Sequence, residues 1–107
     1  MQELDYYQQG DIIIKQSPIS SSHLEKLGDK LDHLVLAEGE ASGHFHKITS
    51  GKAFLYMLGT VMYLRVLEEA RLFHDEHKPI DLPPGNYEID TINEYDHFLE
   101  ETRKVID

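Results

Sequence analysis

The chain has 107 residues, no cysteine, and ten Lys and Arg against 20 Asp and Glu, which gives a formal net charge of −10. This length predicts a single domain over residues 1–107, and 40% hydrophobic residues suffice for one modest core. The negative charge excludes nucleic acid as a partner because it repels phosphate backbones. The lack of cysteine excludes disulfides and thiolate zinc sites. Any metal ion must therefore be held by nitrogen and oxygen ligands.

The N-terminal sequence MQELDYYQQG contains neither a basic leader nor an apolar run. It therefore indicates no secretory signal, and we expect a cytoplasmic protein. The longest apolar stretch, Ala53–Leu67, is too short to cross a bilayer and contains Arg65. We expect no membrane span.

The first predicted strand is GDIIIK, Gly10–Lys15, because consecutive isoleucines between polar residues favour a strand over a helix. In the polar segment that follows, Ser22 and Glu25 are spaced as in a capping box, which predicts a short helix ending near Gly28. A surface loop is the alternative. The segment HLVLAEGEASGHFHKI, residues 33–48, predicts one or two extended pieces interrupted by glycines at which a backbone bends.

A β-hairpin is predicted where AFLYML and VMYLRV flank Gly59 and Thr60. Glycine at the first position of a two-residue loop favours a type II′ turn, and the resulting register pairs Tyr56 with Tyr63. It also pairs Phe54 with Arg65. A rival interpretation makes residues 61–73 a helix, since this segment is rich in good helix formers.

Further along, three prolines and Gly85 divide KPIDLPPGNYEIDTI into two short extended pieces. In the second piece, Tyr87, Ile89 and Thr91 alternate with acidic residues, as in a half-buried strand. Residues 96–107 suit either a helix or a strand. Eight or nine short strands with at most one or two short helices predict an all-β fold, a small antiparallel barrel or sandwich.

Two histidine pairs are the candidate functional residues. His44 and His46 point to the same face of a strand, roughly 7 Å apart, so both rings can reach one metal ion. His74 and His77, in HDEH, fall on opposite faces of a strand and meet only if a turn separates them. We therefore predict a turn at this point, with a carboxylate of Asp75, Glu76 or Glu88 as a further ligand.

The alternatives are structural. Paired histidines can equally be buried side chains that hydrogen-bond to the backbone or to carboxylates, or a cluster that senses pH. The isolated histidines at positions 23, 33 and 97 are expected to be ordinary surface or hydrogen-bonded residues.

The segment GEASGHFH, followed by a hairpin and a Pro-Pro-Gly turn, resembles a minimal cupin, the double-stranded β-helix family. The resemblance covers residues 39–93, with His44 and His46 in place of the paired ligands and Pro83 and Gly85 in place of the turn. It departs from the cupin pattern where Ser50 and Gly51 stand instead of a glutamate, and where Glu88 stands instead of a histidine. His74 and His77 would then substitute for the missing ligands.

The segments GHFH and HDEHKPIDLPPG also resemble a group of small bacterial and phage-type proteins that are uncharacterised, with the motifs GHxH and HxxHxPIxLPPG. This second resemblance is closer but implies no activity.

From these patterns we expect a cupin-like protein that binds one divalent ion, Zn, Fe, Ni, Mn or Cu, through His44, His46, His74 and His77. Such a site is either structural or belongs to a metalloenzyme that acts on a small molecule. The expected partners are a small-molecule substrate and a second copy of the chain in a homodimer. The competing hypothesis is a non-enzymatic, acidic interaction module that binds a protein partner.

Overall fold

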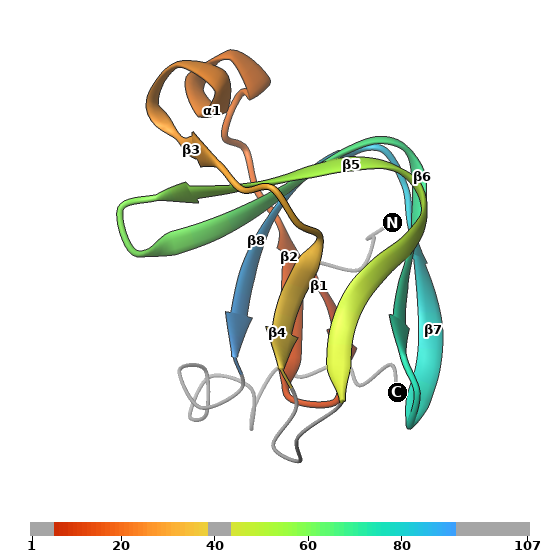
Figure 1. Ribbon diagram of the computed structural model, residues 1–107. Helices are drawn as coiled ribbons and strands as arrows, with labels where there is room; N and C mark the ends of the chain where they lie inside the picture. Colours follow the sequence, from red (N-terminus) through yellow and green to blue (C-terminus); the bar gives the residue numbers. More distant parts are fainter. Residues whose placement is uncertain (1–5, 39–43, 92–107) are drawn as a thin grey trace.

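The computed structural model describes residues 6–38 and 44–91 of the chain. These residues form eight strands and one short helix (Figure 1). In chain order the elements are β1 (Tyr6–Gln9), β2 (Ile12–Gln16), α1 (Ser21–Leu27), β3 (Asp29–Lys30), β4 (Val35–Glu38), β5 (Phe45–Leu58), β6 (Val61–His74), β7 (His77–Leu82) and β8 (Gly85–Thr91). The prediction of an all-β protein with little helix is confirmed.

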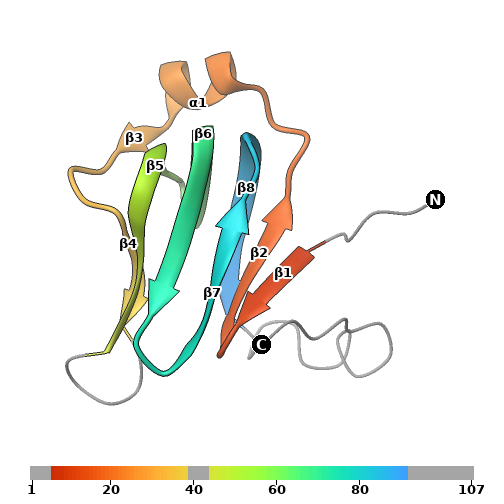
Figure 2. The same ribbon diagram turned by 90° about the vertical axis from the view of Figure 1, so that its right-hand side faces the viewer.

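The strands form one antiparallel sheet with the order β1-β2-β8-β6-β5-β3, in which β4 also pairs with β5 and β7 with β6. The two longest strands change partners along their length: β5 pairs first with β4 and then with β3, while β6 pairs first with β8 and then with β7. The long β5–β6 hairpin arches between these two halves of the sheet (Figures 1 and 2). This folded-over sheet confirms the predicted antiparallel barrel or sandwich.

A glycine permits the irregular pairing within this hairpin. The β5–β6 register shifts on both sides of Gly51, which has a φ of 90°. A Cβ at this position would lie 2.1 Å from the carbonyl oxygen of Glu69, a distance that no real side chain tolerates. Glycine at position 51 therefore allows the two backbones to approach.

The predicted hairpin is confirmed, and the rival helix over residues 61–73 is wrong. Gly59 has a φ of 66°, while Thr60, like every non-glycine residue in the described ranges, has a negative φ, as a type II′ turn requires. Tyr56 pairs with Tyr63, in the predicted register. The strand interpretation prevails because Leu64 and Val66 alternate with more exposed neighbours and enter the core.

Two other predictions need correction. Gly10 does not begin a strand: Gly10 and Asp11 form the turn between β1 and β2, and Gly10 has a φ of 59°. The short β1, which lacks a hydrophobic run, was not predicted. The strands are also not uniformly short, since β5 and β6 have 14 residues each.

The predicted short helix is present, but Ser20 rather than Ser22 is its N-cap. The Ser20 hydroxyl accepts a hydrogen bond from the backbone N–H of His23, and Gly28 is the C-cap. An ion pair between Glu25 of this helix and Arg65 of β6 connects α1 to the hairpin.

The core lies inside the folded sheet. Its largest fully buried members include Tyr87, whose hydroxyl donates to the carbonyl oxygen of Pro83, and aliphatic residues from β2, β5, β6 and β7. The predicted inward alternation of Tyr87 and Ile89 is confirmed. Among the described residues, no helix has the length and apolarity needed to cross a membrane. The predictions for Gly39, Gly43, His97 and residues 96–107 lie outside the described residues.

Candidate metal centre

Three segments that are distant in sequence meet at one end of the sheet, the lower end in Figures 1 and 2. They are the β1–β2 turn, the beginning of β5 and the β6–β7 turn. The predicted turn in HDEH is present, because His74 ends β6, His77 begins β7, and the two residues pair across the hairpin.

The four candidate histidines gather at this end, and we call them the histidine cluster: His44, His46, His74 and His77. The ring centroid of His74 lies 4.4 Å from that of His46, 4.8 Å from that of His77 and 5.9 Å from that of His44. The centroids of His46 and His77 are 6.2 Å apart. The structure thus brings together the two pairs that the sequence presents separately.

His46 lies at the buried centre of the cluster, with 1% of its surface exposed. Its Nδ1 is 2.9 Å from the amide oxygen of Gln9. The amide nitrogen of Gln9 donates to the carbonyl oxygens of Leu72 and Lys78, which identifies the other amide atom as the oxygen. Since an amide oxygen only accepts, the hydrogen-bond network assigns the His46 proton to Nδ1 and leaves a lone pair on Nε2.

Burial also keeps His46 neutral. Desolvation is the largest cause that lowers the pKa of His46, to about 4; the neighbouring His74 and His77 also lower it, while Asp11 raises it. A neutral imidazole is the form of histidine that binds a metal ion.

His74 is buried as well but has the opposite hydrogen-bonding pattern. Its Nδ1 lies 3.1 Å from the backbone nitrogen of Glu76 and accepts that N–H. A neutral His74 therefore carries its proton on Nε2, which in this tautomer has no lone pair for a metal ion. Coordination by His74 would require a change of tautomer or a rotation of its ring.

His44 lies at the more exposed side of the cluster, against two carboxylates. Its Nδ1 is 2.9 Å from Oδ1 of Asp75, and its Nε2 is 3.7 Å from Oε2 of Glu76. The hydrogen bond to Asp75 raises the pKa of His44. This histidine and its two acidic neighbours form a partly solvated, charged rim around the buried rings.

His77 packs against the β1–β2 turn. A Cβ at Gly10 would lie 2.8 Å from Nε2 of His77 and 3.3 Å from Cε1 of His46. Gly10 thus serves two purposes: it adopts the positive φ of the turn and leaves room for two imidazole rings beside it.

The spacing of these rings is close to that of metal ligands. Two imidazoles bound to one tetrahedral ion at about 2.0–2.1 Å have centroids roughly 5 Å apart, within the range found in the cluster. However, in the part of the chain that the structure describes, no group of three or more His, Asp or Glu side chains is arranged so that it could hold a metal ion. The donor types suit a divalent ion, but binding requires side-chain adjustment.

Sequence reasoning missed Asp11, whose Oδ1 lies 3.6 Å from Nε2 of His46. Asp75 and Glu76, two of the predicted carboxylate ligands, lie beside His44 of the cluster. Glu88 does not belong to its three segments, since it pairs with Lys15 and Tyr63 within the sheet. No local signal points to Asp11, because its proximity to His46 arises from the tertiary fold.

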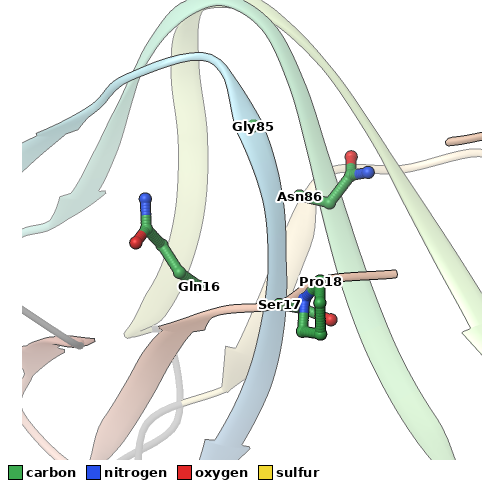
Figure 3. A pocket seen from close by; sticks show the side chains of 5 residues that line it. All are labelled: Gln16, Ser17, Pro18, Gly85 and Asn86. Carbon is green, nitrogen blue, oxygen red and sulfur yellow. The ribbon is translucent and has the colours of Figure 1, made fainter. Parts of the chain in front are cut away.

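Two cavities lie away from the cluster. One, of about 380 Å³, is lined by Gln16, Ser17, Pro18, Gly85 and Asn86 (Figure 3). The other, of about 270 Å³, is lined by residues 30–34 with Ala53 and Phe54. Neither includes a histidine of the cluster.

Comparison with known proteins identifies a family without a described activity. The profile of a domain of unknown function, DUF8820, matches residues 8–91. The chain belongs to the DUF8820 family. The DUF8820 segment contains the three segments of the candidate centre, from Gln8 of β1 to the end of β8. No curated protein and no solved structure matches the chain.

Proposed function

We propose that this protein binds one divalent transition-metal ion at the histidine cluster. The observation that carries the proposal is the convergence of four imidazoles from two distant segments, in which four pairs of ring centroids lie 4.4–6.2 Å apart. The buried imidazole of His46, which is kept neutral, is a good ligand for ions such as Zn, Fe(II), Ni, Mn and Cu(II).

The proposal includes a local rearrangement. His74 presents a protonated Nε2, and the described residues contain no ready group of three ligands. His44 and His77, in contrast, are only partly buried and lie next to turns or at a strand end. Rotation of these rings would bring further nitrogens toward His46 without moving the sheet.

A bound ion with an open coordination position would polarise a substrate carbonyl or lower the pKa of a bound water. Neither of the two cavities described above includes a histidine of the cluster. The proposal is limited to metal binding. The cupin resemblance, the cytoplasmic location and the homodimer stay predictions.

Elemental analysis of protein purified without a histidine tag tests the proposal. We expect about one ion per chain, and loss of the ion in the double variant His44→Ala/His46→Ala. The matched control is His23→Ala/His33→Ala, which also removes two histidines, both exposed and outside the cluster. Circular dichroism spectra must show that each variant is folded. Equal metal content in the two double variants would refute the proposal, as would wild-type protein without metal after exposure to Zn, Fe(II), Ni, Mn and Cu.

Thermal unfolding with and without a chelator separates this proposal from the interaction-module hypothesis. An ion that binds only the native state adds about 2.7 kcal/mol of stability at a free concentration of 100 times its Kd. We expect a lower Tm in chelator for the wild type and an unchanged Tm for His44→Ala/His46→Ala. An interaction module without a metal predicts no chelator effect in either protein.

A further inference from the structure

The lone pair of His46 faces a carboxylate. Gln9 assigns the proton of neutral His46 to Nδ1, so Nε2 presents an electron pair, and this atom lies 3.6 Å from Oδ1 of Asp11. Two electron-pair donors at this distance attract each other only if a cation lies between them. The side chain of His46 is 2% exposed and that of Asp11 is 45% exposed, so the pair is open to solvent from one side.

The distance between the two donors matches shared coordination of a metal ion. A tetrahedral ion at about 2.0–2.1 Å from an imidazole nitrogen and about 2.0–2.2 Å from a carboxylate oxygen separates these atoms by roughly 3.4 Å. The observed separation is 3.6 Å. A proton is the other cation that could occupy this gap, but charging a ring that is 1% exposed is costly.

We infer that Asp11 is a ligand of the metal ion together with His46, and that Gln9 is a positioning residue that turns Nε2 of His46 toward it. This inference rests on the proposed function and adds a ligand from the β1–β2 turn, outside both histidine pairs. Gln9 fits the positioning role because its side chain has three hydrogen bonds, two of them to backbone carbonyls, and is fully buried.

Rotation of the His77 ring would add His77 as the third ligand, since no three described side chains are arranged to hold an ion without such a movement. Its Nε2 and Cε1 of His46 both lie beside Gly10, the residue that precedes Asp11. Two imidazoles and one carboxylate form a nitrogen and oxygen donor set without sulfur. Such a set favours borderline divalent ions, Zn, Fe(II), Co, Ni and Mn, over Cu(I), which prefers sulfur, and over Ca and Mg, which prefer oxygen alone.

Titration with Co²⁺ tests the assignment, because the visible absorption of bound Co²⁺ changes when a ligand changes. In Asp11→Asn we expect the affinity for Co²⁺ to fall by more than about 10-fold. Removing a residue that only supports a metal ligand already costs about 10-fold or more, and removing a ligand itself should cost at least as much. We also expect an altered spectrum. The matched control Asp32→Asn removes the same charge at an exposed position away from the three segments, and we expect the wild-type affinity and spectrum.

The outcomes separate the two claims. Wild-type protein that binds no Co²⁺ overturns the proposed function and this inference with it. Wild-type protein that binds Co²⁺ while Asp11→Asn retains its affinity, or loses affinity with an unchanged spectrum, overturns only the assignment of Asp11. Nitrogen NMR of metal-free wild type checks the role of Gln9 separately: we expect the Nδ1–H tautomer of His46, and the Nε2–H tautomer would overturn it.

Discussion

The amide oxygen of Gln9 lies 2.9 Å from Nδ1 of His46, a residue 37 positions further along the chain. Because the same amide also donates to Leu72 of β6 and Lys78 of β7, one side chain connects β1 with three other strands. The geometry of the histidine cluster therefore depends on how these strands pack together. Substitutions at the β1–β2 turn and within the β5–β6 hairpin should affect that packing.

Gly10→Ala should weaken metal binding, whereas Gly59→Ala should not. Both glycines begin type II′ turns with similar φ values of 59° and 66°, so each alanine should cost about 1–2 kcal/mol of folding free energy. A Cβ at Gly10 would meet the ring of His77 at 2.8 Å, while a Cβ at Gly59 would meet nothing within 4 Å. Urea denaturation and Co²⁺ titration measure the two effects, and equal affinity in the two variants would contradict the prediction.

Gly51→Ala should destabilise the protein by about 3 kcal/mol or more, because it combines backbone strain with overpacking. Its Cβ would lie 2.1 Å from the carbonyl oxygen of Glu69 and 2.6 Å from Cα of Ala70, and backbone atoms cannot move aside as a side chain can. The adjacent, exposed Ser50→Ala is the control and should stay within about 0.5 kcal/mol of wild type in urea denaturation. Similar urea midpoints for Gly51→Ala and Ser50→Ala would contradict the prediction and show that β5 and β6 separate easily at this point.

Metal-free protein should lose stability as the pH falls from about 6.5 toward about 4. The pKa of His46 is lowered from 6.5 to about 4, so in this window the unfolded chain takes up a proton that the folded chain does not. The contribution of neutral His46 to the free energy of unfolding is thus fully present above its pKa in the unfolded chain. It is lost as the pH falls through its pKa in the folded protein, and the loss is on the order of 3 kcal/mol.

Chemical denaturation between pH 4 and pH 7 in chelator measures this loss. His46→Gln, which cannot titrate, should show a flatter profile, while exposed His23→Gln should follow the wild type. Parallel profiles for wild type and His46→Gln would mean that His46 does not carry the pH dependence.

Asp75→Asn should lower the pKa of His44 toward the ordinary histidine value. The hydrogen bond from His44 to Asp75 raises that pKa and lowers the pKa of Asp75. Because the pKa of His44 is higher in the folded protein than in the unfolded chain, the ion pair contributes fully to stability below the pKa of the unfolded chain. This contribution is lost as the pH rises through the pKa of the folded protein. NMR titration of the imidazole in metal-free protein measures the change, and an unaltered His44 titration in Asp75→Asn would exclude this ion pair in solution.

Much of the local structure was predictable from short-range patterns. Gly59 and Thr60 identified the turn and therefore the register that pairs Tyr56 with Tyr63, since a two-residue turn leaves one alignment of the flanking strands. Alternation likewise identified the inward face of β8. The strand β1 escaped prediction because its YYQQ sequence contains no hydrophobic run, and its Gln9 is buried by long-range hydrogen bonds instead.

The sequence by itself determined most of the strands, the turn at Gly59 and Thr60 and the two histidine pairs, because each depends on neighbours within a few residues. Only the tertiary structure decided that both pairs meet, that Gln9 sets the tautomer of His46, and that Asp11 faces its free nitrogen. These relationships join residues from different strands, and their distances depend on where the β5–β6 hairpin bends and how the sheet folds over. A one-dimensional pattern contains no measure of that bend.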